Sequence, residues 1–193
     1  MRRIVVFTLS SLDGAVDDPS RPFPVESDGP SPPGYDAVMD AQEAKLIGRQ
    51  DLILLGRNMY DEWSRYWPTV TEQPFADWIN GVHKVVITSR PLDREWGEVE
   101  AVGGPLSDVV AELKARPGDG DIGVHGSITL VQSLLAEGLV DELQLAVGPV
   151  LDPQGRRLSD ALPDLVRFEL VESVPTTNGG LWLTYRPPPA KRH

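Results

Sequence analysis

The sequence contains no cysteine, and it is short of basic residues and of long apolar runs. Without cysteine the chain has no disulfide, no zinc–thiolate site and no cysteine nucleophile, a composition that fits a reducing compartment. Lysine and arginine number 18 against 29 aspartates and glutamates, which gives a formal net charge of −11. Such a charge repels nucleic acid and anionic membranes at long range, so we expect neither as a partner.

No stretch approaches the roughly 20 apolar residues that cross a bilayer. The N-terminal apolar run from Ile4 to Leu9 is too short for a secretion signal, so we expect a cytoplasmic protein. The 193 residues, 40% of them hydrophobic, favour one globular domain. We place this domain at residues 1–187 and a flexible tail at 188–193.

Apolar strand-like runs alternate with helical patterns along the chain. The expected strands are 4–9, 51–56, 84–88, 98–102, 121–125, 141–150, 167–174 and 180–186. The expected helices are 35–49, 71–80, 106–115 and 128–137, and a long irregular loop covers 17–33. This alternation predicts an α/β fold, with a mostly parallel sheet and helices on both faces. The turn signal Asn178-Gly179 predicts a C-terminal antiparallel hairpin.

Glycines and arginines follow three of the expected strands at their carboxyl ends, where open α/β sheets bind ligands. These segments are Gly56-Arg57-Asn58-Met59, Ser89-Arg90 and His125-Gly126-Ser127-Ile128-Thr129. Glycine lets a ligand approach the backbone, and both arginine and a helix N-terminus bind phosphate. Each segment alone also fits a strand end, a turn or an N-cap, but the three together favour a ligand site.

These segments resemble the dihydrofolate reductase superfamily, above all its branch related to the reductase domain of riboflavin biosynthesis. The resemblance extends over nearly the whole chain and includes Ser11-Leu12-Asp13-Gly14, Leu55 to Glu62, Val86 to Arg90, Gly126-Ser127, Gly138 to Leu143, Gly148 to Leu151 and Gly155 to Leu158. It implies a three-layer dihydrofolate reductase-like fold and NADPH as cofactor. Its 2′-phosphate would lie at Arg57-Asn58-Met59 and Ser89-Arg90, and its pyrophosphate at Gly126 to Thr129.

Two positions depart from that family. Met59 stands where threonine is frequent, which leaves the preference between NADPH and NADH open. His125 stands beside Gly126 where glycine is common, and it is either a phosphate or substrate contact or a structural histidine. No cysteine is present to hold the zinc of a deaminase, so within riboflavin synthesis the chain would supply only the reductase half.

The proton donor is sought among carboxylates near the expected substrate site. Counting back from Gly56, as the resemblance implies, places Asp40 at the position of the acid in dihydrofolate reductases, with Glu43 one turn further along. Asp13 follows the first strand and either contacts the ligand or shapes its turn. The other interpretation of Asp40 and Glu43 is that both are solvated helix charges.

Two further groups have open roles. Trp63, Trp67 and Trp78 either stack on a flat heterocycle or pack in a core or dimer interface, and Arg156-Arg157 either binds a substrate phosphate or is a solvated pair. The sequence thus predicts an NADPH-dependent reductase of a small heterocycle, pterin-like or a pyrimidine of riboflavin synthesis. The alternatives are a non-catalytic binding module on the same fold and a structural protein with incidental motifs. Apolar residues on both faces of the late strands also predict a homodimer.

Overall fold

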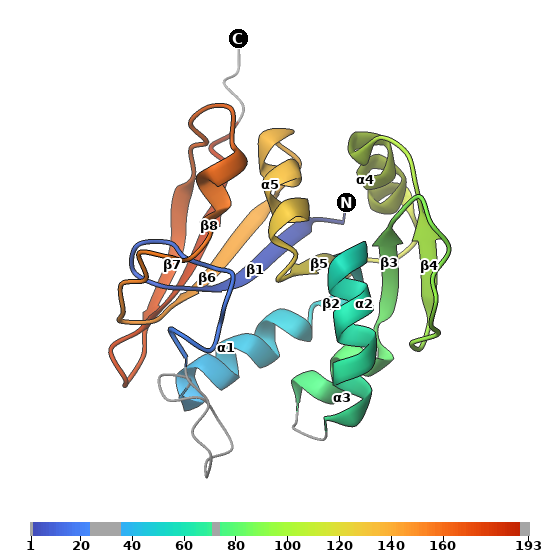
Figure 1. The fold of residues 1–193 in the computed structure, drawn as a ribbon. Helices are drawn as coiled ribbons and strands as arrows, with labels where there is room; N and C mark the ends of the chain where they lie inside the picture. Colours follow the sequence, from blue (N-terminus) through green and yellow to red (C-terminus); the bar gives the residue numbers. More distant parts are fainter. Residues whose placement is uncertain (1, 24–35, 71–73, 190–193) are drawn as a thin grey trace.

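The computed structural model describes residues 2–23, 36–70 and 74–189. One sheet runs through the molecule in the order β4-β3-β2-β5-β1-β6-β8-β7 (Figure 1). Its strands are β1 (Ile4–Ser10), β2 (Gln50–Gly56), β3 (His83–Ile87), β4 (Val99–Val102), β5 (Asp121–His125), β6 (Glu142–Val147), β7 (Glu169–Pro175) and β8 (Leu181–Arg186). Every pairing is parallel except the two that β8 makes with β6 and β7. The α/β fold with a C-terminal antiparallel hairpin is therefore confirmed.

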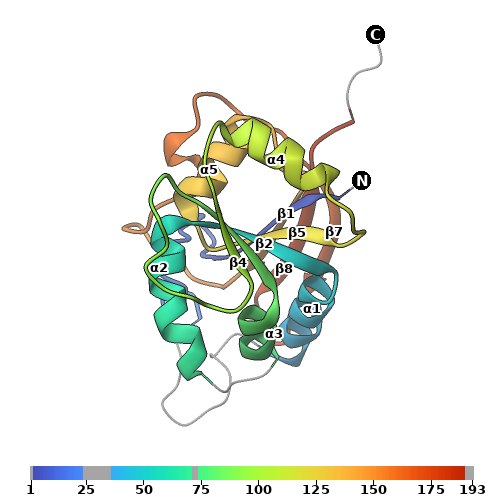
Figure 2. The same cartoon turned by 90° about the vertical axis from the view of Figure 1, so that its right-hand side faces the viewer.

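Helices cover both faces of the sheet, as expected. They are α1 (Ala37–Ile47), α2 (Arg57–Tyr66), α3 (Phe75–Gly81), α4 (Leu106–Ala115) and α5 (Ile128–Ala136), with 3-10 turns at Trp67–Thr69 and Leu158–Ala161. Figures 1 and 2 show α4 and α5 on one face and α1 with α3 on the other. Strand alternation divides the core accordingly, because Ile4 and Val6 pack toward α4 and α5 whereas Val5 and Phe7 pack toward α1.

Three elements differ from the sequence expectation. Helix α2 was not expected, since its buried residues Tyr60 and Ser64 form only a narrow stripe one turn apart. The helix expected at 71–80 is α3, which begins at Phe75, and residues 71–73 lie outside the described residues. Strand β6 ends at Val147 rather than at 150, because Gly148 and a proline without an N–H follow it.

The expected helix 35–49 is α1, whose N-cap is Asp36, and Tyr35 lies outside the described residues. Most of the expected loop 17–33 lies outside them too. The sheet takes its strands from residues 4–186. The domain boundary at residue 187 stays a prediction.

Candidate active site at the carboxyl ends of the strands

Strands β2 and β5 are neighbours, and each leads into a helix at the same edge of the sheet. Gly56 ends β2 and α2 begins at the next residue, while α5 begins two residues after Gly126. The two helix starts are in contact, since a Cβ atom on Gly56 would lie 2.6 Å from Ser127 Oγ. A larger residue at position 56 would therefore push the two helices apart.

Neither of these helices has a side-chain cap at its start. Gly56 and Ser127 occupy the N-cap positions of α2 and α5, and no side-chain hydrogen bond caps either one. The first N–H groups therefore lack side-chain acceptors, and the positive end of each helix dipole lies at the carboxyl edge of the sheet. Two such starts in contact suit the phosphates of a nucleotide. The segment Gly126 to Thr129, expected at the pyrophosphate, is part of this arrangement, which we call the cradle.

Gly126 shapes the cradle through its backbone. Its φ of +69° lies in the left-handed region that favours glycine. A Cβ atom there would lie 3.1 Å from Met59 Cε and 3.5 Å from Trp63 Cζ2. Met59 and Trp63 thus pack directly against the glycine turn, and they place apolar atoms rather than a hydroxyl beside the cradle.

Arg57 joins α2 to the loop after β3. Its Nε donates to both carboxylate oxygens of Asp61, at 2.8 and 2.9 Å, and its Nη2 donates to Asp93 Oδ2 at 2.6 Å. Its Nη1 donates to the carbonyl oxygen of Pro91 at 2.6 Å. The hydrogen bond that Arg57 donates to Asp61, together with the charges of Asp61 and Asp93, raises the pKa of Arg57. Arg90, in contrast, is exposed and has no ion-pair partner among the described residues.

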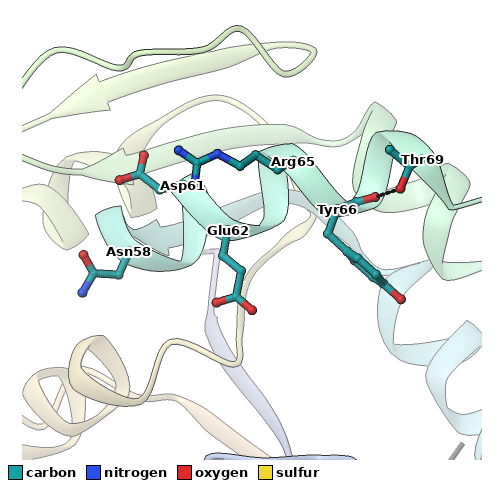
Figure 3. A pocket seen from close by; sticks show the side chains of 6 residues that line it. All are labelled: Asn58, Asp61, Glu62, Arg65, Tyr66 and Thr69. Carbon is teal, nitrogen blue, oxygen red and sulfur yellow. Dashed lines mark hydrogen bonds between the residues drawn. The ribbon is translucent and has the colours of Figure 1, made fainter.

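An open hollow of about 550 Å³ extends along the outer side of α2 (Figure 3). It is lined by Asn58, Asp61, Glu62, Arg65, Tyr66 and Thr69. Of the residues expected at the site, only Asn58 lines this hollow. Ser89, another expected residue, lies exposed on the loop after β3 and does not line it. The hollow is wide and mixed in charge, and no glycine turn borders it. Of these two places, the cradle is therefore the one that combines a glycine turn with uncapped helix starts.

His125 is buried just before the cradle, with 3% of its surface exposed. Its Nε2 lies 2.7 Å from Gln50 Oε1, and its ring centroid lies 5.7 Å from that of Phe7. Burial lowers the pKa of His125 to about 3, so the ring is neutral at pH 7. Of its two expected roles, these contacts favour the structural one.

Asp13 is bound on every side by its own chain. Its Oδ1 accepts from Ser11 Oγ at 2.6 Å and from the Asp152 backbone N–H at 2.8 Å, and its Oδ2 accepts from Arg157 Nη2 at 2.6 Å. The Ser11 hydrogen bond is the largest of the influences that lower the pKa of Asp13 to about 2. Asp13 is therefore an ionised group that ties the loop after β1 to residues 152–157.

Asp40 has a different environment. It lies on the exposed side of α1, one turn after the N-cap Asp36. Desolvation and then the like charge of Asp36 raise the pKa of the Asp40 carboxyl. A carboxyl that donates a proton near neutral pH needs a pKa above its ordinary value, so the shift of Asp40 has the required direction.

The tryptophans singled out in the sequence belong to one group of rings. Trp63 lies 5.8 Å from Trp67 and 6.1 Å from Phe75, centroid to centroid. Phe75 in turn lies 5.3 Å from Trp78, whose ring is 5.2 Å from that of His125. The group therefore extends from the cradle to α3.

Several partners in the site escaped the sequence analysis. Asp61 could have been found as the partner of Arg57 from its spacing of four residues within a helix. Asp93 and Gln50 carry no such local signal. Arg157 was expected as a solvated residue or a phosphate ligand, but it donates to Asp13 and to three backbone carbonyl oxygens.

Within the part of the chain that the structure describes, no helix is long and apolar enough to cross a membrane.

A curated relative, the uncharacterized protein YyaP of Bacillus subtilis (strain 168), is 27% identical over 144 residues, which are 72% of this chain and 76% of YyaP. A crystal structure of a candidate riboflavin biosynthesis protein from Shewanella sp. PV-4 has a TM-score of 0.70 and 23% identity, covering 96% of this chain and 99% of the other.

Dihydrofolate reductase from Enterococcus faecalis, complexed with NADP(H), has a TM-score of 0.60 at 14% identity, with 96% of each chain covered. These likenesses establish the fold that the strand order shows. The model of the RibD C-terminal domain family matches residues 2–181, which is nearly the whole chain. With the glycine turn, the two joined helix starts and the C-terminal hairpin in place, this chain belongs to the RibD C-terminal domain family.

Proposed function

We propose that this protein is an NADPH-dependent reductase that transfers a hydride to a small heterocyclic substrate. The observation that carries the proposal is the cradle, where two uncapped helix starts meet at closely packed glycines. A Cβ atom on Gly56 would lie 2.6 Å from Ser127 Oγ, and one on Gly126 would lie 3.1 Å from Met59 Cε. These residues fit a nucleotide pyrophosphate, because backbone N–H groups and helix dipoles there can meet its charge. The dihydrofolate reductase likeness, which is of fold, supports the same cofactor.

When bound, NADPH supplies a hydride to a C=N or C=O carbon, and the nitrogen or oxygen of that bond then needs a proton. Asp40 is the donor that we propose, since its pKa is raised and its side chain is exposed to a ligand or a water. Asp13, an expected catalytic residue, is held ionised by hydrogen bonds from Ser11, the Asp152 backbone and Arg157, so its proposed part is to keep the loop after β1 in place.

Arg90 provides the test of the preference between NADPH and NADH. Its guanidinium has no ion-pair partner among the described residues, so no carboxylate there competes with a cofactor phosphate for it. A charge-assisted phosphate contact is worth about 1.5–3 kcal/mol, so Arg90→Ala should weaken NADPH binding at least about tenfold and leave NADH binding unchanged. Arg94→Ala, an exposed arginine in the same loop, is the matched control. Titration by NADPH fluorescence measures both, and equal loss for the two cofactors would show that Arg90 does not read the 2′-phosphate.

A non-catalytic binding module is the second candidate function. Two observations favour it: Met59 places a thioether against the glycine turn, and Asp13 has all its oxygens engaged. NADPH oxidation against a panel of pterins and pyrimidines separates the two candidates. Turnover that falls in Asp40→Asn supports the reductase, and cofactor binding without any turnover supports the module.

We also propose a homodimer formed through the β7 edge of the sheet. Among the described residues, strand β7 pairs only with β8, and its neighbouring residues Leu170 and Val171 are both exposed. Leu165 and Val166 extend this apolar surface on the preceding segment. A second copy would cover both faces of the strand. Light scattering at micromolar concentration tests this, and a mass near 21 kDa contradicts it. A cytoplasmic location of the protein is a separate prediction.

A further inference from the structure

A second cavity lies between α1 and the strands β6, β7 and β8, toward the amino ends of the parallel strands and away from the cradle. It has a volume of about 170 Å³, and we call it the α1 cavity. Gln42 and Lys45 of α1 and Arg49 just after it line one side, since residues three and four positions apart share a helix face. Sites for drug-sized ligands take roughly 300 Å³ or more, so the α1 cavity suits a small molecule or ion.

The sheet forms the other side of the α1 cavity. Glu172 of β7, Thr184 of β8 and Gln144 of β6 are neighbours in the strand register, so they form a row across three strands. Gln144 has both ends of its amide paired, since its Nε2 donates to Glu142 Oε1 at 2.7 Å and its Oε1 accepts from Trp182 Nε1 at 2.9 Å. Thr184 has 6% of its surface exposed, and its hydroxyl makes no hydrogen bond within the described residues. Buried hydroxyls are nearly always paired, so Thr184 calls for a partner in the cavity that it lines.

Two arginines that line the cavity keep part of their hydrogen-bonding capacity. Arg186 donates from Nε and Nη2 to Glu142 Oε2, at 3.0 and 2.8 Å. Arg49 donates from Nε and Nη2 to Asp121 Oδ2, at 3.2 and 2.7 Å. The Nη1 group of each arginine has no acceptor among the described residues. Each guanidinium is thus fixed by a carboxylate and still has N–H groups to donate.

Lys45 is the third cation in the lining. Its Nζ lies 3.6 Å from Glu172 Oε2, which is longer than a good hydrogen bond, and both side chains are about half exposed. Exposed ion pairs of this kind contribute little to stability. An anion in the cavity can therefore compete with Glu172 for the ammonium group of Lys45.

The ion-paired groups around the α1 cavity have an excess of positive charge. Four of them are cations and three are anions, namely Arg3, Lys45, Arg49 and Arg186 against Asp121, Glu142 and Glu172. Glu142 is fully buried and contacts all three arginines, so its charge is compensated within the protein. This local excess contrasts with the formal net charge of −11 for the whole chain.

The α1 cavity therefore offers spare guanidinium N–H groups, an ammonium group and an unpaired hydroxyl, which are donors that suit an oxyanion. A cation would find only Glu172, because the carboxylate of Glu142 is in use. We propose that the α1 cavity binds a small oxyanion, either tetrahedral or a short carboxylate, at a place separate from the cradle. The bound anion would join the end of α1 to β8 and so add to the contacts that hold this end of the sheet. The inference goes beyond the proposed reductase function and does not depend on it.

Isothermal titration calorimetry with the full chain tests the proposal. Phosphate, sulfate and acetate are titrated separately, with chloride keeping the ionic strength constant, and we expect saturable binding of at least one of them at millimolar concentration. Comparing phosphate and sulfate with acetate distinguishes a tetrahedral anion from a carboxylate. Affinity and not melting temperature is the measure, because phosphate and sulfate also stabilise folded proteins without binding to a site. No saturable binding of any of the three overturns the proposal.

Substitutions in the lining locate the bound anion. Thr184→Val removes the hydroxyl, keeps the shape of the side chain and should weaken binding about tenfold. Lys45→Met should weaken it about threefold, and its exposed position keeps the test decisive if Thr184→Val does not fold. All titrations use one protein concentration, because Val171 of the lining also belongs to the β7 edge proposed for the homodimer. Wild-type affinity in the folded lining variants would place the anion elsewhere and overturn the proposal.

Lys114→Met is the matched control. Lys114 belongs to α4 on the other face of the sheet, pairs with Asp141 and does not line the cavity, so its loss should leave the affinity unchanged. A decrease as large as that in Lys45→Met would reflect net charge alone and would count against the site.

Glu172→Gln tests the sign of the ligand charge. It removes the carboxylate that competes for Lys45, so it should strengthen anion binding about threefold. Weaker binding in Glu172→Gln than in wild type would mean that this carboxylate assists the ligand, and would overturn the assignment of an anion to the α1 cavity.

Discussion

The two ends of the parallel strands differ in how completely their polar groups are paired. At the amino ends, Arg3, Arg49 and Arg186 surround Glu142, which is fully buried, and the first two also bind Asp121. Arg186 Nη2 lies 2.8 Å from Glu142 Oε2. This network joins β1, the end of α1, β5, β6 and β8.

At the carboxyl ends the groups are left open. Helices α2 and α5 start there without side-chain caps. Gly126 holds a left-handed turn there. Unpaired donors and unusual backbone cost stability, so they persist only where the rest of the fold supplies enough of it. The comparison supports the proposal that the amino ends stabilise the sheet and that the carboxyl ends bind a ligand.

The largest expected effect comes from the amino-end network. Burial opposes ionisation of Glu142, but hydrogen bonds from Gln144 and Arg186 and the charges of Arg3 and Arg49 outweigh it and lower the pKa of Glu142. Glu142→Gln removes a fully buried anion from three partly exposed arginines. Because several charge-assisted hydrogen bonds lose their acceptor charge together, the free energy of unfolding in urea should fall by about 3–5 kcal/mol.

The matched control is Glu172→Gln, whose partner Lys45 lies 3.6 Å away at an exposed position and which should change stability by less than about 1 kcal/mol. NADPH affinity of the folded Glu142→Gln protein should stay at the wild-type value. A loss of affinity as large as the loss of stability would contradict the division between the two ends.

The next effect concerns Lys84, which is the second residue of β3 and is fully buried. Burial lowers the pKa of Lys84 to about 8 from 10.5. Because the folded state holds this proton less tightly than the unfolded state, the cost of the buried charge is complete below pH 8 and disappears by pH 10.5. Wild type should therefore gain roughly 3 kcal/mol relative to Lys84→Met over this interval.

Unfolding in urea at pH 7.5, 9 and 10.5 measures that gain. Lys45→Met, at an exposed lysine, should show no such dependence on pH. A constant difference between wild type and Lys84→Met at all three values would mean that Lys84 is solvated in the folded protein.

The smallest expected effect distinguishes the carboxyl end from an ordinary turn. Gly126 and Gly138 have nearly the same φ, +69° and +66°, so alanine at either position should cost about 1–2 kcal/mol of stability. A Cβ atom on Gly138 meets nothing within 4 Å, whereas one on Gly126 meets Met59 and Trp63. Only Gly126→Ala should also weaken NADPH binding, as fluorescence titration would show, and equal affinity in the two variants would place the cradle elsewhere.

The sequence analysis predicted most of the fold, and the place that it gave for the site stays a prediction. Strand β5 and helix α5 could be predicted because their apolar residues have clear periods and Gly138 ends the helix. Helix α2 could not, since it is mostly polar and its stability comes from packing Tyr60 against a sheet formed by distant residues. The glycines of the cradle were found because each directly follows a buried strand.

Local pattern therefore determined the alternation of strands and helices, and with it the edge where a ligand could bind, because period and glycine placement are properties of neighbouring residues. Only the tertiary structure decided which charges are paired. Asp13 meets Arg157 across 144 residues, and Arg57 is shared between Asp61 and Asp93, the latter 36 residues away. Partners this distant are chosen by how the sheet brings loops together, and no spacing in the sequence records that choice.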